Sequence, residues 1–405
     1  MTPFAHRIGR TRPAATFAMA ARARALRDAG HQVISLAIGE PDLPTPDHVI
    51  AAAGAAAQAG QTKYPPVTGT LSLRAAVARK FSRDQGISVE PDDVLIGNGG
   101  KQIIFNAVMA LIEAGDEVII PTPCWAGYLQ VVDFAGGTPI FVSSNADTGF
   151  KLEANALAAA ITPRSKLLLL NFPNNPSGAT ADLTMLQNIA DVLRKFPHVR
   201  VIADDIYEHL VFDGAYHALA AVAPDLADRI LTLSGVSKSY AMTGWRLGFA
   251  TGPRDWLRAM ALVQGTATAG VSTISQAAAL AALDGPQDLL AERRAIYRRR
   301  RDLVVAGLAP VAGLDCPVPN GAFYVFPSIT GWLGRRSAGG RVLVNDDAVA
   351  EALLEEALLA TVPGSAFALH GHIRLSTATS DTLLLEACQR IAAFSAALSD
   401  HVAAF

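Results

Sequence analysis

ILTLSGVSKSYAMTGWR, residues 230–246, begins with an apolar run that predicts a buried strand and continues into a loop of small residues that holds Lys238. Open α/β sheets bind ligands beyond the carboxyl ends of their strands, which is where this loop would lie. A lysine kept there, away from bulk water, can lose its proton and form a Schiff base with a carbonyl group. Arg246, on the same segment, could hold a phosphate by bidentate hydrogen bonds. The combination favours pyridoxal phosphate as a cofactor over the alternative, a surface lysine in a basic loop.

Strand and helix patterns alternate around this stretch, from residue 45 to residue 251. Most of the predicted strands are continuous apolar runs, which is typical of strands covered on both faces. Helical patterns lie between most of them, so we expect an α/β fold with a mainly parallel seven-stranded sheet. No crossover helix separates the last two strands, which permits one antiparallel strand. The seven predicted strands are residues 93–98, 117–121, 138–142, 166–170, 199–203, 230–233 and 247–251.

A long helical pattern at residues 289–308 leads toward a second, smaller α+β domain. We predict a large cofactor-binding domain at residues 45–300 and a small domain made of residues 1–44 and 301–405. The large domain opens with a helix that Thr45 would cap, with Pro46 in its first turn. The small domain is expected to contain the segment 321–326, a helix at 348–359, a strand at 372–376 and a final helix capped by Ser380.

Composition limits the partners of the chain. Its 405 residues are 51% hydrophobic and 17% charged, and 34 basic against 36 acidic residues give a formal net charge of −2. This balance predicts neither a nucleic-acid partner nor a membrane partner. The basic run Arg298–Arg301 is interpreted as a solvated helix face. Three distant cysteines form neither a metal-binding spacing nor a disulfide framework, so we expect a cytoplasmic protein without a metal.

Two loops after predicted strands could contact a cofactor. Residues 97–102 read GNGGKQ, and the glycines at 99 and 100 would let backbone N–H groups at a helix start approach a phosphate. A plain turn explains this loop equally well. Residues 171–178 read NFPNNPSG, where Asn175 could present its amide to a phenolic oxygen. A structural turn is the alternative here too, because Asn, Pro and Gly are ordinary turn residues.

Four further side chains are candidates by position. Asp204 ends a strand and could pair with a protonated pyridine nitrogen, while Asp205 points to the other side of the extended chain and is interpreted as solvated. Tyr207 could donate to the same phenolic oxygen as Asn175. Trp125 could stack on a cofactor ring, although a core position is the alternative. Arg374 lies in an apolar strand, so it needs an anion, either a substrate carboxylate or an internal salt bridge.

With these motifs in view, the chain resembles the pyridoxal-phosphate-dependent class I aminotransferases of fold type I. Within them it is most similar to the bacterial aspartate aminotransferases of the prephenate-accepting branch. The resemblance covers nearly the whole chain and includes, besides the segments above, residues 12–16, 39–42, 63–66, 321–324 and 362–365 and Arg374.

The resemblance implies roles for individual residues. Lys238 would carry the cofactor and move the proton, with Asp204 and Tyr207 as its catalytic partners. Tyr64 would reach the cofactor phosphate of a second subunit, which implies a homodimer with shared active sites. The other implied cofactor contacts are Gly99, Gly100, Lys101, Trp125, Asn175, Ser237 and Arg246, and the implied substrate contacts are Gly39, Arg374, Lys101, Arg12, Thr16, Trp125 and Asn175.

The activity implied is ping-pong transamination between L-aspartate and 2-oxoglutarate through pyridoxamine phosphate, with prephenate as a further acceptor. Cys124, Thr377 and Ala15 depart from the residues usual in this family. None of them touches the cofactor chemistry, and those near the substrate pocket bear on the amino-acid preference. The alternatives are an aminotransferase for aromatic or neutral amino acids, a pyridoxal-phosphate-dependent β-lyase, and a non-catalytic regulator that binds the same cofactor.

Overall fold

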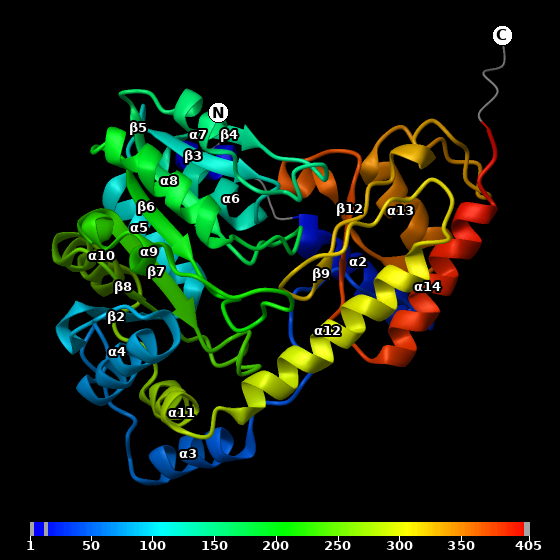
Figure 1. The fold of residues 1–405 in the computed structure, drawn as a ribbon. Helices are drawn as coiled ribbons and strands as arrows, with labels where there is room; N and C mark the ends of the chain where they lie inside the picture. The colour runs from blue at the N-terminus through cyan, green and yellow to red at the C-terminus, as the bar shows by residue number, and fades with distance from the viewer. Residues whose placement is uncertain (1–3, 12–14, 401–405) are drawn as a thin grey trace.

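A computed structural model describes residues 4–11 and 15–400 of the chain, and a seven-stranded sheet forms its centre (Figure 1). The strand order is β2-β8-β7-β6-β5-β3-β4, and β8 is antiparallel to both of its neighbours while the other pairs are parallel. The predicted mainly parallel seven-stranded sheet is therefore confirmed, including its single antiparallel strand. The strands are β2 (Val94–Gly97), β3 (Glu117–Thr122), β4 (Thr138–Ser143), β5 (Ser165–Asn171), β6 (Arg200–Asp204), β7 (Ile230–Gly235) and β8 (Gly248–Thr251).

Alternate residues of the central strands enter different cores, which explains their continuous apolar runs. In β5, Leu167 and Leu169 belong to the core shared with α5 (Gly100–Leu111), α6 (Ala126–Ala135) and α10 (Arg254–Ala267). Leu168 and Leu170 belong to the opposite core, shared with α7 (Ala154–Ala160) and α8 (Leu183–Lys195). Because side chains alternate along a strand, a strand covered by helices on both faces must be apolar throughout.

Beside the large sheet lies a smaller group of elements. β12 (Ile373–Ser376) pairs antiparallel with β9 (Tyr324–Val325) and β11 (Val362–Pro363), and β1 (Ile34–Ser35) pairs in parallel with β10 (Leu359–Ala360). Figure 1 shows the long helix α12 running from the neighbourhood of α11 to α14. The helices not yet bounded are α1 (His6–Arg10), α2 (Ala15–Asp28), α3 (Asp47–Gln58), α4 (Leu71–Gln85), α9 (Leu219–Val222), α11 (Thr273–Asp284), α12 (Asp288–Leu308), α13 (Asp346–Glu356) and α14 (Asp381–Ala396), with short 3-10 helices at Pro91–Asp93, Pro224–Arg229, Thr330–Trp332 and Gly364–Phe367.

The predicted division into domains stays a prediction, and two observations bear on it. The predicted boundary at residue 300 falls inside α12, which is one continuous helix. The N-terminal segment contacts both parts. Met19 of α2 shares a hydrophobic core with Leu354 of α13, whereas Arg7 of α1 lies over the ring of Phe134 in α6, 5.7 Å from its centroid.

Helix ends follow the predicted capping signals in some places and not in others. Ser380 caps α14, since its hydroxyl accepts from the N–H of Leu383. Thr45, predicted to cap α3, instead donates its hydroxyl to the carbonyl of Ala241 at 2.9 Å, and Pro46 precedes the first helical residue. The prediction for Thr45 was wrong because its hydroxyl bonds to the carbonyl of Ala241, which is distant in the sequence, instead of to the start of the helix.

The basic run on α12 is also different from its prediction as a solvated face. Arg298 and Arg299 are exposed, but Arg300 and Arg301 are only 6% and 4% exposed. Arg300 binds both carboxylate oxygens of Asp42, at 2.7 and 2.9 Å. Arg301 donates to Asp213 at 2.6 Å and to the carbonyl of Pro319. Burial was possible because each guanidinium acquired an anionic partner from a distant segment.

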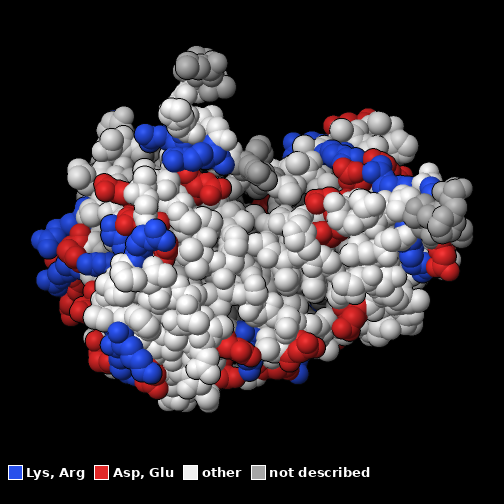
Figure 2. All heavy atoms as spheres, turned by 90° about the horizontal axis from the view of Figure 1, so that it is seen from above, with Lys and Arg blue, Asp and Glu red and all other residues white. Residues whose placement is uncertain are grey.

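Two global features concern partners. In the view of Figure 2, charges of both signs gather along the sides of the molecule, with a broad uncharged area between them. This mixture agrees with the near-zero net charge. None of the helices in the described residues combines the length and the apolar character that crossing a bilayer requires.

Candidate active site

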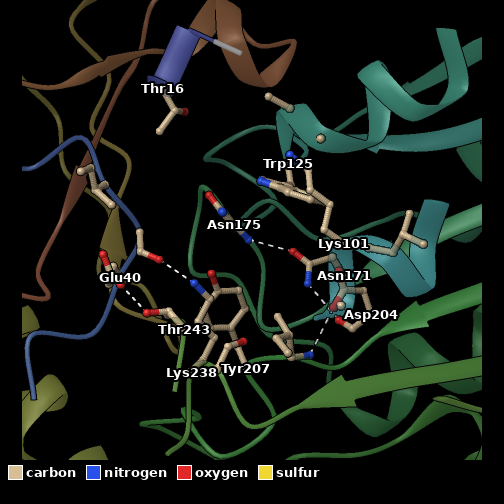
Figure 3. A pocket seen from close by; sticks show the side chains of 18 of the residues that line it. Thr16, Glu40, Lys101, Trp125, Asn171, Asn175, Asp204, Tyr207, Lys238 and Thr243 are labelled. Atoms are coloured by element: carbon tan, nitrogen blue, oxygen red, sulfur yellow. Dashed lines mark hydrogen bonds between the residues drawn. The ribbon is translucent and has the colours of Figure 1, made fainter. Parts of the chain in front are cut away.

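Residues at or just beyond the carboxyl ends of β5, β6 and β7 line a cavity of about 420 Å³. The other walls come from the first turns of α5 and α6, from residues 38–40, and from β9 and β12. Figure 3 shows side chains from these separate segments surrounding one common space. The cavity brings together these predicted site residues: Thr16, Gly39, Gly100, Lys101, Trp125, Asn175, Asp204, Tyr207, Ser237, Lys238, Arg246 and Arg374.

Two other predicted residues, Gly99 and Tyr64, do not line the cavity. Gly99 precedes α5 directly and lies against Arg246. Tyr64 is 97% exposed, so its predicted contact with a second subunit has no counterpart within this chain. Arg12 lies outside the described residues.

Lys238 is half-buried, and its Nζ donates to the carbonyl oxygen of Gly39 at 2.6 Å. Burial, together with the positive charge of Arg374, lowers the pKa of Lys238 to about 8. An amine with this pKa is partly neutral near neutral pH, so it can act as a nucleophile and also exchange a proton. The predicted reactivity of Lys238 is therefore consistent with its surroundings.

Asp204, at the end of β6, is a buried carboxylate with two donors. The Tyr128 hydroxyl donates to its Oδ2 at 2.6 Å, and the N–H of Ile206 donates to its Oδ1 at 3.3 Å. Burial raises the pKa of Asp204 to about 6, and the hydrogen bonds from Tyr128 and Ile206 partly oppose that rise. Asp204 can therefore be ionised at neutral pH, and a cationic partner in the cavity would stabilise that form.

The burial of Asp205 differs from its prediction. It was interpreted as a solvated carboxylate, but it is only 6% exposed, and burial raises its pKa well above the usual value. The two neighbours differ because alternation along the chain turns Asp204 into the cavity and Asp205 away from it.

Two predicted hydrogen-bond donors have partners from distant segments. The hydroxyl of Tyr207 lies 2.7 Å from that of Tyr324. The Oδ1 atom of Asn175 accepts from Nη1 of Arg374 at 2.9 Å. This bond fixes the orientation of the Asn175 amide and leaves its N–H groups available to an acceptor in the cavity.

Gly99 and Arg246 form a cradle of N–H donors where α5 begins. Gly99 has a φ of 81°, and a Cβ there would lie 2.7 Å from Nη2 of Arg246. Only glycine lets the backbone approach the guanidinium this closely. Arg246 donates to the carbonyl of Thr243 at 2.9 Å, which holds it beside the free N–H groups of the first turn of α5.

Arg374 is 2% exposed and has no carboxylate partner within the described residues. Its Nη2 donates to the carbonyl of Ala37, and its Nε has no hydrogen-bond partner in that part of the chain. The alternative of an internal salt bridge therefore finds no support there. A buried guanidinium that faces a cavity and lacks an anion is a suitable site for a ligand carboxylate.

At the mouth of the cavity, Lys101 lies beside two aromatic rings. Its Nζ is 5.5 Å from the ring centroid of Trp125 and 5.6 Å from that of Phe17. Burial and the charge of Arg246 lower the pKa of Lys101. No carboxylate among the described residues pairs with it. Lys101 therefore joins Arg374 and Arg246 as a cation that lines the cavity without a carboxylate partner in the described residues.

Sequence reasoning named no role for five residues that complete the site. Tyr128 donates to the carboxylate of Asp204. Asn171 donates its side-chain amide to the carbonyl of Asp204 at 2.9 Å, and Thr243 donates to the Glu40 carboxylate (Figure 3). The fifth residue, after Tyr128, Asn171, Thr243 and Glu40, is Tyr324, whose hydroxyl contacts that of Tyr207. The spacing of Tyr128 from Trp125, three residues along the start of one helix, is the signal that could have indicated it. The other contacts join distant segments and leave no local pattern.

Comparisons with known proteins agree with this geometry. The family profile described as aminotransferase class I and II matches residues 31–391. An aspartate/prephenate aminotransferase from Cereibacter sphaeroides is 49% identical over 393 residues, which is 97% of this chain and 98% of the relative. A solved aspartate aminotransferase from Rhizobium meliloti has a TM-score of 0.95 at 47% identity, covering 98% of this chain and all of the other. A Thermus thermophilus aspartate aminotransferase, solved with maleate, has a TM-score of 0.90 at 39% identity, covering 97% of this chain and all of the other.

Proposed function

The chain belongs to the class I and II aminotransferases, and from that premise we propose that it transfers the amino group of L-aspartate to 2-oxoglutarate. One observation carries the choice of substrate. Three arginine or lysine side chains besides Lys238 line the cavity and lack a carboxylate partner among the described residues; Arg246 lies at the start of α5, where a phosphate would bind, which leaves Arg374 and Lys101 for the substrate. An amino acid with carboxylates at both ends matches such a pair. Prephenate is a second candidate acceptor, favoured by the activity named for the Cereibacter relative.

The residues of the cavity fit pyridoxal phosphate. The cradle at Gly99 and Arg246 suits a phosphate, the buried carboxylate of Asp204 suits a protonated ring nitrogen, and Lys238 offers an amine of low pKa. When bound, this cofactor links covalently to an amine and withdraws electrons from the adjacent carbon. The residues proposed to hold it are Lys238, Asp204, Tyr207, Asn175, Trp125, Gly99, Gly100, Ser237 and Arg246.

Lys238 is the proposed general base and acid. With a pKa lowered to about 8, its amine can take a proton from the substrate Cα and return a proton without a large energetic cost in either direction. The carbonyl of Gly39 accepts a hydrogen bond from Nζ at 2.6 Å and so holds the amine of Lys238 in one position.

Arg374 and Lys101 are proposed to orient the substrate. Arg374 would bind the α-carboxylate by a bidentate contact, held in place by Asn175 and the Ala37 carbonyl. Lys101 would bind the distal carboxylate, with Thr16 and Arg12 as further contacts. When both carboxylates of the substrate are bound, its Cα–H bond is held in one orientation toward Lys238. This lowers the entropic part of the barrier to proton transfer.

We also propose a homodimer located in the cytoplasm. The 97% exposed ring of Tyr64 is unusual for an aromatic side chain, and burial against a second copy would remove it from water. The three cysteines are unpaired, which suits a reducing compartment. Sedimentation of wild-type protein and Tyr64→Ala, with cofactor affinity measured in parallel, tests whether Tyr64 acts across subunits.

A panel of amino donors with 2-oxoglutarate tests the substrate. Aspartate should give the highest kcat/KM, and alanine and phenylalanine much lower values, because neither offers a carboxylate to Lys101. A preference for aromatic or neutral donors would overturn the assignment. Release of ammonia from an amino acid without any oxo acid would instead indicate a lyase.

A further inference from the structure

We propose that Tyr324 is a positioning residue that joins the carboxylate-binding Arg374 to the hydroxyl of Tyr207. The inference rests on the proposed function, and it adds a residue to which that function assigns no role. Tyr324 is 1% exposed, lines the cavity, and contacts both groups, one through its ring and the other through its hydroxyl.

The ring of Tyr324 supports Arg374. The guanidinium carbon lies 4.6 Å from the ring centroid of Tyr324 and 4.9 Å from that of Phe367, so Arg374 is held between two aromatic rings. A guanidinium gains electrostatic attraction from such rings without satisfying its N–H groups. Arg374 can thus be buried in the absence of a carboxylate and still keep Nε free for a ligand.

The hydroxyl of Tyr324 orients Tyr207. The two oxygens are 2.7 Å apart, and only one proton can lie between them. No other hydrogen bond of the Tyr324 hydroxyl occurs in the described part of the chain, so its proton is available to the oxygen of Tyr207. When it is donated there, the proton of Tyr207 is directed into the cavity, toward the phenolic oxygen that Tyr207 is proposed to hold.

Gly39 fixes the position of this hydroxyl. A Cβ on Gly39 would lie 2.0 Å from the Tyr324 oxygen, so the segment that accepts from Lys238 packs directly on it. The Tyr324 side chain therefore cannot rotate without displacing Gly39, whose carbonyl accepts from Lys238. The ring and the hydroxyl have separate tasks, and separate substitutions can test them.

The hydroxyl is tested by the pH titration of the visible absorbance of the cofactor-loaded protein. A hydrogen-bond donor to a phenolic oxygen stabilises the anionic form of that oxygen. Loss of the donor should therefore raise the apparent pKa of the absorbance change. Tyr324→Phe should raise it by roughly 0.5–1 pH unit, as expected for a weakened hydrogen bond. Tyr207→Phe should raise it further, and the double variant should match Tyr207→Phe, because Tyr324 acts through Tyr207. Additive shifts, or no shift in Tyr324→Phe, would overturn the proposal.

The ring is tested by binding of succinate, a dicarboxylate that cannot react. Tyr324→Phe keeps the ring and should bind succinate within about twofold of wild type, whereas Tyr324→Leu should bind it at least about fivefold more weakly. Equal weakening in the two variants would contradict the separation of tasks. Tyr297→Phe is the matched control: its hydroxyl is buried in the same aromatic cluster without a hydrogen-bond partner in the described residues, so neither readout should move.

The outcomes separate this inference from the function on which it rests. Wild-type protein that acquires no visible absorbance with pyridoxal phosphate would refute the proposed function. Wild-type protein that acquires it, while Tyr324→Phe titrates like wild type, would refute only the role of Tyr324.

Discussion

Removing the hydroxyl of Tyr128 should change how the cofactor affinity depends on pH, because that hydroxyl is the strongest donor to Asp204. It donates to Oδ2 at 2.6 Å, and the carboxylate is otherwise buried. Tyr128→Phe keeps the ring, which packs edge-on against Trp125 with centroids 5.2 Å apart. The substitution therefore removes one hydrogen bond and leaves the packing in place.

The size of the effect follows from the charge on the acceptor. A hydrogen bond to a charged group contributes about 1.5–3 kcal/mol, and one pH unit corresponds to about 1.4 kcal/mol. Tyr128→Phe should thus raise the pKa of Asp204 by roughly 1–2 units above its value of about 6. At pH 7 the ionised fraction would fall from about nine in ten to between one in ten and one half.

The sign of the pH dependence is fixed, since only the ionised carboxylate can pair with a protonated ring nitrogen. Raising its pKa moves the acidic limb of the binding profile to higher pH. Titration of the apoprotein with pyridoxal phosphate from pH 6 to 9 should show affinity weakened about two- to tenfold at pH 7, with the difference vanishing near pH 9. Lys238 titrates in both proteins, so the ratio of the two affinities isolates Asp204.

A suitable control is Tyr240→Phe, which loses a bond of the same length, 2.6 Å to Gln287, without touching Asp204. Its profile should follow that of wild type. A Tyr128→Phe profile parallel to wild type at every pH would refute the reasoning, because a structural defect alone would weaken binding equally across the range.

Three further predictions concern Lys238, Lys101 and Gly39. Lys238→Ala should abolish transamination and the visible absorbance of the bound cofactor, and borohydride reduction of the wild type should tag Lys238; a tag on any other lysine would contradict its role. Lys101→Ala should lower kcat/KM for aspartate by roughly tenfold or more but leave alanine nearly unchanged, and equal losses would exclude the distal contact. Gly39→Ala should lower both Tm and activity, because its Cβ would lie 2.0 Å from the Tyr324 hydroxyl; Gly54→Ala, with nothing within 4 Å, should change neither.

The central sheet could be predicted because its signal is local. The four leucines of β5 and the apolar run of β7 identify buried strands without any knowledge of their neighbours. The alternation of side chains along an extended chain also separated Asp204 from Asp205 as the residue that faces the cavity. The predicted site residues meet at one cavity because parallel strands end at the same edge of a sheet.

Burial and pairing of polar groups could not be predicted in the same way. Arg300 and Arg301 read as part of a solvated run, and Asp205 read as a solvated carboxylate, yet all three are buried. Thr45 read as a helix cap but bonds to Ala241, 196 residues away. For Arg300, Arg301 and Thr45, the partner that satisfies the polar group comes from a segment that no local pattern connects to it. Asp205 differs, because its Oδ2 atom is buried without a hydrogen-bond partner in the described residues.

Periodicity and short motifs are enough to predict the strands, the lysine loop and the residue types needed at the cavity. How those residues act depends on contacts made only in the folded chain: the Tyr128–Asp204 bond, the Asn175–Arg374 bond and the Tyr207–Tyr324 pair. These pairs join residues 76, 199 and 117 positions apart. Proton affinity and orientation depend on the distance to the nearest charge or donor, and only the folded chain sets that distance.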